Sequence, residues 1–309
     1  MTHRHQRWIG VDIGGTKVAA AVITSAGEVI ESVRAQTPPT GRVGVLETAA
    51  ALIDQLRAGH SVNGIGVGAP GIIDRASGRV VFASDILPGW NGAEVREELE
   101  AHTGLPVTVD NDVRVMAHGE NMIGAGYGRS SVLFVSIGTG IGGALSIDGR
   151  LRHGAHGTAG ELAHLLVPAS GAIGCGCGRK DHLEAVASGP AMAAEYASRA
   201  GVPVQPLQRV VALMHSGDPI ARAVISEAGE LLGRVLAGVA TAFDPEVIVI
   251  GGGAAQIGAD LLSPLVSAFR IEAMRPVAET AILPARLGTD APLVGAGLLA
   301  AATRTEGSR

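Results

Sequence analysis

The segment Val11-Asp12-Ile13-Gly14-Gly15-Thr16-Lys17 joins two runs of small apolar residues, 8–13 and 18–24. Each run has the length and composition of a strand, and glycines between two strands mark a tight turn. Glycine lets backbone N–H groups approach an anion closely, and threonine adds a hydroxyl donor. The segment therefore predicts a phosphate-binding turn made by Asp12, Gly14, Gly15, Thr16 and Lys17. A tight hairpin with an incidental acid is the alternative.

A similar segment occurs in the second half of the chain. Val135-Ser136-Ile137-Gly138 also runs through threonine and glycine into a strand of small residues, 142–147. Self-similarity of this kind indicates a duplicated unit. We therefore expect two related α/β halves that face each other, with Gly138, Thr139 and Gly140 as a second phosphate cradle.

The rest of the chain alternates between the periods of strands and helices. Further strands are expected at 28–33, 64–67, 105–109, 132–137, 143–147 and 246–250, and helices at 44–58, 93–102, 113–122, 219–241 and 293–302. This alternation predicts an α/β fold, whose ligands collect at the carboxyl ends of strands. Gly252 and Gly253 follow one of these strands and are expected to lie under a nucleotide base or ribose. The spacing of a Walker A motif is absent.

Composition excludes several classes of protein. The chain has 309 residues, 47% hydrophobic and 17% charged, which predicts about two domains with a large core and argues against disorder. The net charge is −5 and no basic stripe is visible, so no nucleic-acid partner is expected. No apolar run is long enough to span a bilayer, and the two cysteines are poorly spaced for a disulfide. We expect a soluble cytoplasmic protein with no membrane partner.

Three polar residues, Asp110-Asn111-Asp112, follow an expected strand and begin an expected helix. Asp and Asn are ordinary N-caps, and capping alone is one interpretation. The other places Asp112 as the general base toward a sugar hydroxyl, with Asn111 bonded to a neighbouring hydroxyl. Phosphoryl transfer needs little more than such a base, positioned phosphates and a metal such as Mg²⁺, held through water by Asp12.

These segments, together with Glu161-Leu162-Ala163-His164, Cys175-Gly176-Cys177-Gly178 and Glu184, resemble the ROK family of repressors and sugar kinases. The resemblance runs from about residue 8 to residue 301. It implies a two-lobed actin-like fold of the hexokinase and ribonuclease H type, with a central cleft. It also implies ATP as the phosphate donor and a homo-dimer or homo-tetramer.

The resemblance also implies roles for particular residues. Asp112 matches the catalytic base, and the substrate ligands are Gly71, Asn111, Asp112, Glu161, His164 and Glu184. The implied reaction is the phosphorylation of a hexose, with glucose first and N-acetylmannosamine or N-acetylglucosamine as alternatives. Polyphosphate in place of ATP stays open. The implied lobes are residues 1–116 with 291–309, and residues 117–290.

The sequence departs from the family at three places. The acid-x-Gly-His of the family is here Glu161-Leu162-Ala163-His164, a mild change. The residues after Asn-Asp are usually small in the family, whereas Val113 and Arg114 follow here, and we expect Arg114 to point to solvent. The third zinc cysteine of the family is absent, and His182 stands at its place. We therefore expect a structural Zn²⁺ held by His164, Cys175, Cys177 and His182, because two thiolates and two imidazoles suit tetrahedral zinc. A glycine-rich loop with two free cysteines is the alternative.

Three other functions compete with a sugar kinase. Repressors of the family carry a DNA-binding domain before the first phosphate turn, and the eleven residues before Asp12 are expected to be too few for one. An actin-like ATPase without a sugar substrate is disfavoured by the expected sugar ligands. A sugar-binding regulatory protein without catalysis stays open.

Overall fold

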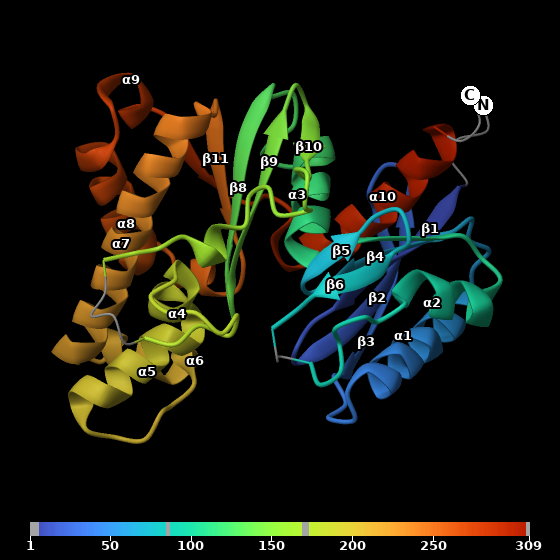
Figure 1. The fold of residues 1–309 in the computed structure, drawn as a ribbon, viewed down its shortest axis with the longest axis horizontal. Helices are drawn as coiled ribbons and strands as arrows, with labels where there is room; N and C mark the ends of the chain where they lie inside the picture. Colours follow the sequence, from blue (N-terminus) through green and yellow to red (C-terminus); the bar gives the residue numbers. More distant parts are fainter. Residues whose placement is uncertain (1–5, 85–86, 169–172, 307–309) are drawn as a thin grey trace. The chain divides into compact units, whose positions relative to one another are not determined.

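The computed structural model describes residues 6–84, 87–168 and 173–306. Expectations for residues 1–5 and 307–309 of the first lobe therefore lie outside the described residues. The chain forms two compact units, which Figure 1 colours along the sequence. Unit 1 comprises residues 1–128, 153–159 and 286–309, and unit 2 comprises residues 129–152 and 160–285. No helix among the described residues is long and apolar enough to cross a membrane.

Unit 1 is built on a five-stranded mixed sheet. Its strands lie in the order β3-β2-β1-β4-β7. They are β1 (Arg7–Ile13), β2 (Lys17–Thr24), β3 (Val29–Gln36), β4 (Ile65–Ala69) and β7 (Val107–Asn111). β1 pairs with β2 antiparallel and with β4 parallel, and β4 pairs with β7 parallel. A separate hairpin is formed by β5 (Ile72–Asp74) and β6 (Arg79–Phe82).

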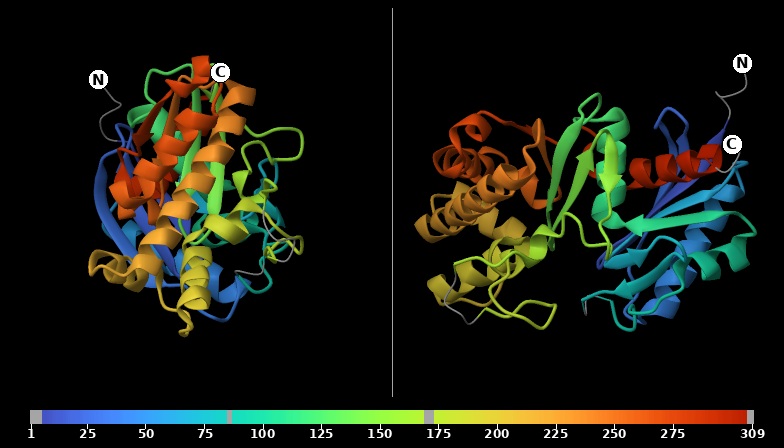
Figure 2. Two further views of the ribbon diagram at one scale, coloured as in Figure 1. Left: turned by 90° about the vertical axis from the view of Figure 1, so that its left-hand side faces the viewer. Right: turned by 45° about the horizontal axis from the view of Figure 1, so that its top comes forward.

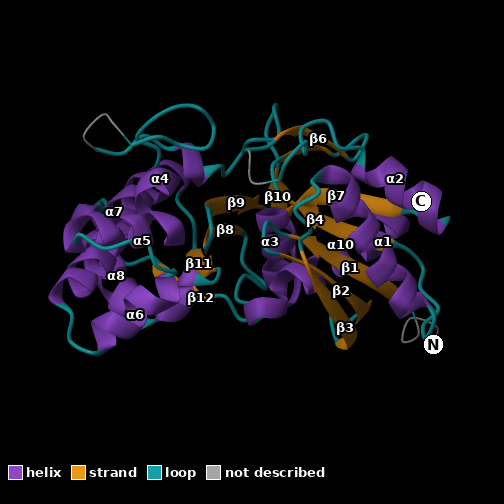
Figure 3. Ribbon diagram, turned by 90° about the horizontal axis from the view of Figure 1, so that it is seen from below, coloured by secondary structure: helices purple, strands orange, loops and turns teal. Residues whose placement is uncertain are grey.

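Helices cover both faces of this sheet, because its strands carry apolar side chains on both faces. The helices of the unit are α1 (Arg42–Arg57), α2 (Val95–Thr103), α3 (Asp112–Ile123) and α10 (Ala291–Glu306), with the 3₁₀ turn η4 (Gly288–Asp290). Val18, Ala20 and Val22 of β2 face the core with α1, whereas Ala19, Ala21 and Ile23 face α10. Figure 3 shows α1 and α2 on one side of the strands and α3 on the other. Glycine at position 10 lets α10 lie close, since a Cβ there would lie 1.9 Å from the oxygen of Leu293.

Unit 2 repeats the sheet of unit 1. Its strands lie in the order β10-β9-β8-β11-β12. They are β8 (Ser131–Ile137), β9 (Ile141–Ile147), β10 (Arg150–Arg152), β11 (Val247–Gly251) and β12 (Ala281–Pro284). β8 pairs with β9 antiparallel and with β11 parallel, and β11 pairs with β12 parallel. Along each sheet, two antiparallel strand pairings are therefore followed by two parallel pairings. This shared order confirms the internal duplication expected from the two glycine turns.

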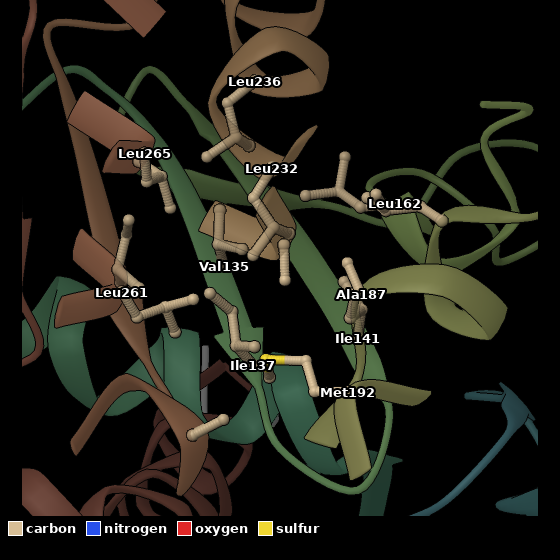
Figure 4. Packing of buried hydrophobic residues seen from close by; sticks show 14 of the residues in the cluster. Val135, Ile137, Ile141, Leu162, Ala187, Met192, Leu232, Leu236, Leu261 and Leu265 are labelled. Carbon is tan, nitrogen blue, oxygen red and sulfur yellow. The ribbon is translucent and has the colours of Figure 1, made fainter. Parts of the chain in front are cut away.

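The core of unit 2 lies between this sheet and a layer of helices. The helices are α4 (Leu183–Ala187), α5 (Gly189–Ala200), α6 (Leu207–His215), α7 (Pro219–Phe243), α8 (Ala259–Glu272) and α9 (Arg275–Ala278), with 3₁₀ turns η2 (Leu162–His164) and η3 (Ala254–Ile257). α7 and α8 lie side by side (Figure 2). Figure 4 shows Val135 of β8 next to Leu232 of α7, and Ile137 of β8 next to Met192 of α5. This packing holds the carboxyl end of β8 rigidly.

The expected α/β class and each expected helix and strand are present, with ends displaced by a few residues. The small elements β5, β6 and β10, the helices α4, α5, α6, α8 and α9, and β12 were not expected. The expected lobe boundary between residues 116 and 117 falls inside α3, and the whole of α3 packs on α10 in unit 1.

Candidate active site

The first glycine turn projects from the end of β1 in unit 1. Gly14 donates its N–H to the oxygen of Lys17 at 2.9 Å, which closes the turn. The hydroxyl of Thr37 donates to the oxygen of Gly14 at 2.6 Å, and its N–H donates to the oxygen of Thr16 at 3.1 Å. Gly15, Thr16 and Lys17 are exposed. The turn is thus braced from one side and open on the other, as a phosphate loop requires. Sequence reasoning missed Thr37, because the contact joins segments far apart in the chain.

Asp12 lies half-buried at the base of this turn. Burial raises its pKa to about 6, against the opposing effect of the Lys17 charge. A carboxylate made costly by burial is stabilised by a bound cation. The residue type, its place and its electrostatics fit a site for Mg²⁺.

The second glycine turn and the third lie together in unit 2, because β8 and β11 are neighbouring parallel strands. Gly252 has φ of 91°, and a Cβ there would lie 2.4 Å from the oxygen of Ile137, so only glycine fits. Gly138 donates its N–H to the oxygen of Gly140 at 2.8 Å, and its own oxygen accepts from Gly189 at 2.9 Å. Thr139 is exposed. The five predicted phosphate and nucleotide residues of this unit, Gly138, Thr139, Gly140, Gly252 and Gly253, thus form one region.

Asn111 is buried at the carboxyl end of β7 and caps α3. Its side-chain oxygen accepts the N–H groups of Val113 at 3.0 Å and Arg114 at 3.2 Å. Its amide nitrogen donates to the oxygen of Gly71 at 3.1 Å. Gly71 has φ of 98° and follows β4, so two predicted sugar ligands meet here. Capping therefore occupies the oxygen of Asn111, and one N–H of its amide remains for a ligand.

Asp112 is the first residue of α3 and is partly exposed. One of its carboxylate oxygens accepts the N–H of Val113 at 2.9 Å. A carboxylate at a helix N-terminus is stabilised by the helix dipole. Asp112 is therefore presented at the carboxyl edge of the sheet, where a general base is expected.

The expectation that Arg114 points to solvent is wrong. Its side chain is 1% exposed, and one of its nitrogens lies 3.9 Å from a carboxylate oxygen of Asp110. The helix period places Arg114 on the face of α3 that packs inward, together with Val115. A buried guanidinium needs partners. Asp110 lies four residues earlier, and the oxygens of Gly157 and Ala159 come from a distant segment of unit 1.

Glu161, His164 and Glu184 belong to unit 2, where α4 packs against η2. Glu184 accepts the N–H of Ile141 at 3.0 Å, beside the second glycine turn. A Cβ at Gly140 would lie 2.4 Å from the same oxygen, so a larger residue there would require the Glu184 side chain to move. Glu161 precedes η2 and is partly exposed. The carboxylate of Glu184, a predicted sugar ligand, thus contacts the second phosphate cradle. The spacing of the residues in the sequence does not reveal this contact.

The four predicted metal ligands form a cluster in unit 2. One donor atom from each of His164, Cys175, Cys177 and His182 lies within 4.8 Å of all the others. The Nδ1 atoms of His164 and His182 are 3.3 Å apart, and the Cys177 sulfur lies 3.2 Å from Nδ1 of His182. Zn–S bonds are about 2.3 Å and Zn–N bonds about 2.0 Å, so the edges of a tetrahedron around zinc are about 3.3–3.8 Å. The residues fit zinc.

A short hairpin brings the two cysteines of the cluster together. Cys175 donates its N–H to the oxygen of Arg179 at 2.8 Å, and Gly178 donates to the oxygen of Cys175 at 2.9 Å. Burial raises the pKa of the Cys175 thiol, and burial also lowers the pKa of His164 against the charge of Glu184. Both pKa shifts favour the neutral form of the side chain. A bound cation would reverse the direction for the thiol, because zinc deprotonates a coordinating cysteine.

Comparison with known proteins identifies the family of this chain. The model of the ROK family matches residues 8–303. The chain belongs to the ROK family. A glucokinase of Halalkalibacterium halodurans is 35% identical over 317 residues, covering 95% of this chain and 94% of that protein. An N-acetyl-D-glucosamine kinase of Photobacterium profundum is 30% identical, covering 80% of this chain and 84% of that protein.

A solved structure of the ROK family confirms the expected two-lobed actin-like fold. It is a ROK family glucokinase from Streptomyces griseus in complex with glucose and AMPPNP. It is similar to this chain with a TM-score of 0.87 and 34% identity, covering 96% of this chain and 99% of that chain.

Proposed function

We propose that this ROK protein is an ATP-dependent kinase that converts glucose to glucose 6-phosphate. The observation that carries the proposal is the pair Asn111–Asp112, a buried amide and a presented carboxylate at the N-terminus of α3. Relatives named as glucokinases, and a ROK glucokinase structure holding glucose and an ATP analogue, support it. A relative named as an N-acetyl-D-glucosamine kinase supports the runner-up, an N-acetylglucosamine or N-acetylmannosamine kinase.

In the proposed reaction, Asp112 accepts the proton of the attacking hexose hydroxyl. The hydroxyl oxygen then forms a bond to the γ-phosphorus of ATP while the bond from that phosphorus to the β–γ bridging oxygen breaks, and ADP leaves. Gly14 and Gly138 donate their N–H groups within their own turns, so the phosphate oxygens are proposed to bind to the N–H groups of Gly15, Thr16 and Thr139 and to the two threonine hydroxyls. Asp12 would hold Mg²⁺ through water, and the ion would supply positive charge that neutralises the phosphates.

Sugar hydroxyls are proposed to bind to Asn111, Glu161, His164 and Glu184, and Gly71 is proposed to belong to a segment near the sugar. The amide of Asn111 offers an N–H, and the second oxygen of Glu184 offers an acceptor because the first accepts from Ile141. His164 turns Nδ1 toward the metal cluster, which leaves Nε2 for a hydroxyl. A mixed set of donors and acceptors matches a hexose, since each hydroxyl both donates and accepts.

The substrate is tested by coupled ADP release with glucose, mannose, fructose, N-acetylglucosamine and N-acetylmannosamine. We expect kcat/KM for glucose to exceed that for each other sugar at least ~10-fold, the discrimination that a few unmade contacts supply. A higher kcat/KM for an acetylated amino sugar would replace glucose by the runner-up. Tight sugar binding without ADP release would indicate a regulatory protein without catalysis. Polyphosphate in place of ATP is a second arm of the assay.

We further propose that His164, Cys175, Cys177 and His182 hold one structural Zn²⁺. The metal would orient His164 and the hairpin that leads to α4, on which Glu184 lies. His182 is buried and directly precedes α4, so it joins the cluster to the helix that carries the sugar ligand. The zinc is not proposed to take part in phosphoryl transfer.

Zinc is tested by elemental analysis of protein purified without chelator. About one zinc per chain is expected, and His182→Ala is expected to lower the occupancy and to loosen residues 173–184. The matched control is His182→Cys, which restores a third thiolate and is expected to keep zinc. Metal-free wild-type protein with full activity and a protected hairpin would contradict the proposal.

The assembly is proposed to be a homo-dimer or homo-tetramer, as the family resemblance implies. Light scattering of the purified chain measures the mass directly, and a monomer at assay concentration would contradict it.

A further inference from the structure

Residues 153–159 form a closed loop, here called the strap. Ala159 donates its N–H to the oxygen of His153 at 3.1 Å, which closes the loop. Gly154 and Gly157 take positive φ values of 76° and 72°, a conformation that glycine adopts without strain. The strap packs within unit 1, although the chain on either side of it belongs to unit 2. The strap is therefore a segment that must be held in place by unit 1.

Two side-chain contacts from the start of α3 and the end of β7 hold the strap. At one end, Nε2 of His153 lies 2.8 Å from a carboxylate oxygen of Asp110. At the other end, a guanidinium nitrogen of Arg114 donates to the oxygen of Gly157 and, at 3.3 Å, to the oxygen of Ala159. A buried guanidinium with two carbonyl acceptors fixes a backbone more firmly than a neutral donor does.

The carboxylate of Asp110 lies near both residues that hold the strap, His153 and Arg114. It is 2% exposed, and burial raises its pKa. The hydrogen bond and charge of His153, the N–H of Asn111 and the charge of Arg114 together outweigh burial and hold the pKa of Asp110 below its usual value. Its oxygens also lie 3.5 Å from Nε of Arg75 and 3.9 Å from Arg114. The carboxylate thus keeps three partners if the Arg114 charge is removed: His153, Arg75 and the N–H of Asn111, at 2.8 Å.

Arg114 and the strap each lie close along the chain to a predicted sugar ligand. Arg114 follows Asp112 by two residues on the first turn of α3, and Asn111 caps that turn. The strap ends at Ala159, and Glu161 follows two residues later. Arg114 thus joins the turn that carries the proposed base to the segment that leads into a proposed sugar ligand.

We propose that Arg114 is a positioning residue for the sugar, which acts by holding the strap and thereby the start of the Glu161 segment. This inference rests on the proposed function, because it concerns the sugar of the same reaction. It predicts that Arg114 affects the binding of sugar and leaves the binding of ATP unchanged.

The test is Arg114→Met, which keeps length and apolar volume and removes the donors. We expect KM for glucose to rise at least ~10-fold, a loss of ~1.4 kcal/mol, with KM for ATP within ~2-fold of wild type. Hydrogen exchange at the amides of the strap is expected to speed up. Arg114→Lys retains a charged donor and is expected to recover part of the KM for glucose. The matched control is Arg57→Met, since Arg57 also donates to a backbone oxygen, that of Thr103 at 3.0 Å, in unit 1.

The outcomes separate the inference from the proposed function. An unchanged KM for glucose in Arg114→Met, whether or not the strap exchanges faster, would overturn the positioning role while leaving the kinase intact. Equal changes in KM for glucose and for ATP, with no recovery in Arg114→Lys, would also overturn it. Wild-type protein that phosphorylates no hexose would contradict the proposed function itself, and the inference would fall with it. If Arg114→Met does not fold, the test rests on Arg114→Lys, through its KM for glucose and the hydrogen exchange of its strap amides. Wild-type values of both would overturn the inference.

Discussion

Asp112→Asn is expected to lower kcat at least ~10²-fold, the lower end of the contribution of a general base. The amide cannot accept the proton of the sugar hydroxyl, whereas its size and its place on α3 stay the same. KM for glucose is expected to change far less than kcat, because the loss arises in the transition state. Steady-state kinetics with glucose and ATP measure both values.

The fold of Asp112→Asn is expected to survive, because Asn111 and not Asp112 caps α3. Wild-type melting temperature and wild-type sugar affinity would separate lost chemistry from lost structure. The matched control is Asp148→Asn, since the side chain of Asp148 is 82% exposed and lies outside the proposed site. Turnover of Asp112→Asn near the wild-type value would remove Asp112 from the mechanism.

Asp12→Asn is expected to have two opposite effects. Activity is expected to fall ~10–100-fold, the usual cost of losing a group that holds a metal through its outer shell. The unliganded protein is expected to melt at a higher temperature than wild type at neutral pH. The reason is that partial burial raises the free energy of the ionised carboxylate in the folded protein, whereas the amide is neutral and avoids this desolvation cost.

The sign of the stability effect follows from the pKa of Asp12. The carboxyl titrates near 3.8 when unfolded and near 6 when folded, so the folded state binds more protons between these values. Ionised Asp12 therefore destabilises the fold fully above pH 6, and this cost fades as the pH falls toward 3.8. The shift corresponds to about 3 kcal/mol at most.

Thermal melts without magnesium at pH 5 and pH 8 measure this difference. The gap in melting temperature between Asp12→Asn and wild type is expected to be larger at pH 8, by a few degrees. Added Mg²⁺ and ATP are expected to narrow the gap, because they stabilise only the protein that binds them. An equal gap at both pH values, or full activity of the variant, would contradict the role assigned to Asp12.

Local sequence determined the glycine turns, the duplication and most of the strands, whereas β5, β6, β10 and β12 were not expected. The turn after β1 was predictable because glycines between two apolar strands leave the backbone little alternative, and its counterpart after β8 repeats the pattern. Asn111 and Asp112 were recognisable because a polar pair between a strand and a helix has few roles. Gly252 also followed from local sequence, although its need for glycine comes from its contact with Ile137.

Contacts between distant segments decided the rest. Arg114 is charged and was expected in solvent, yet the oxygens of Gly157 and Ala159, more than forty residues away, make its burial possible. Glu184 meets the N–H of Ile141 at a similar separation, and no spacing rule links them. The sequence, with the family resemblance, predicted which groups bind phosphate, sugar and metal, because residue type limits chemistry. Only the tertiary structure decided which of these groups meet within each unit. The entropic cost of closing a loop rises slowly with its length, so a partner far along the chain is almost as accessible as a near one.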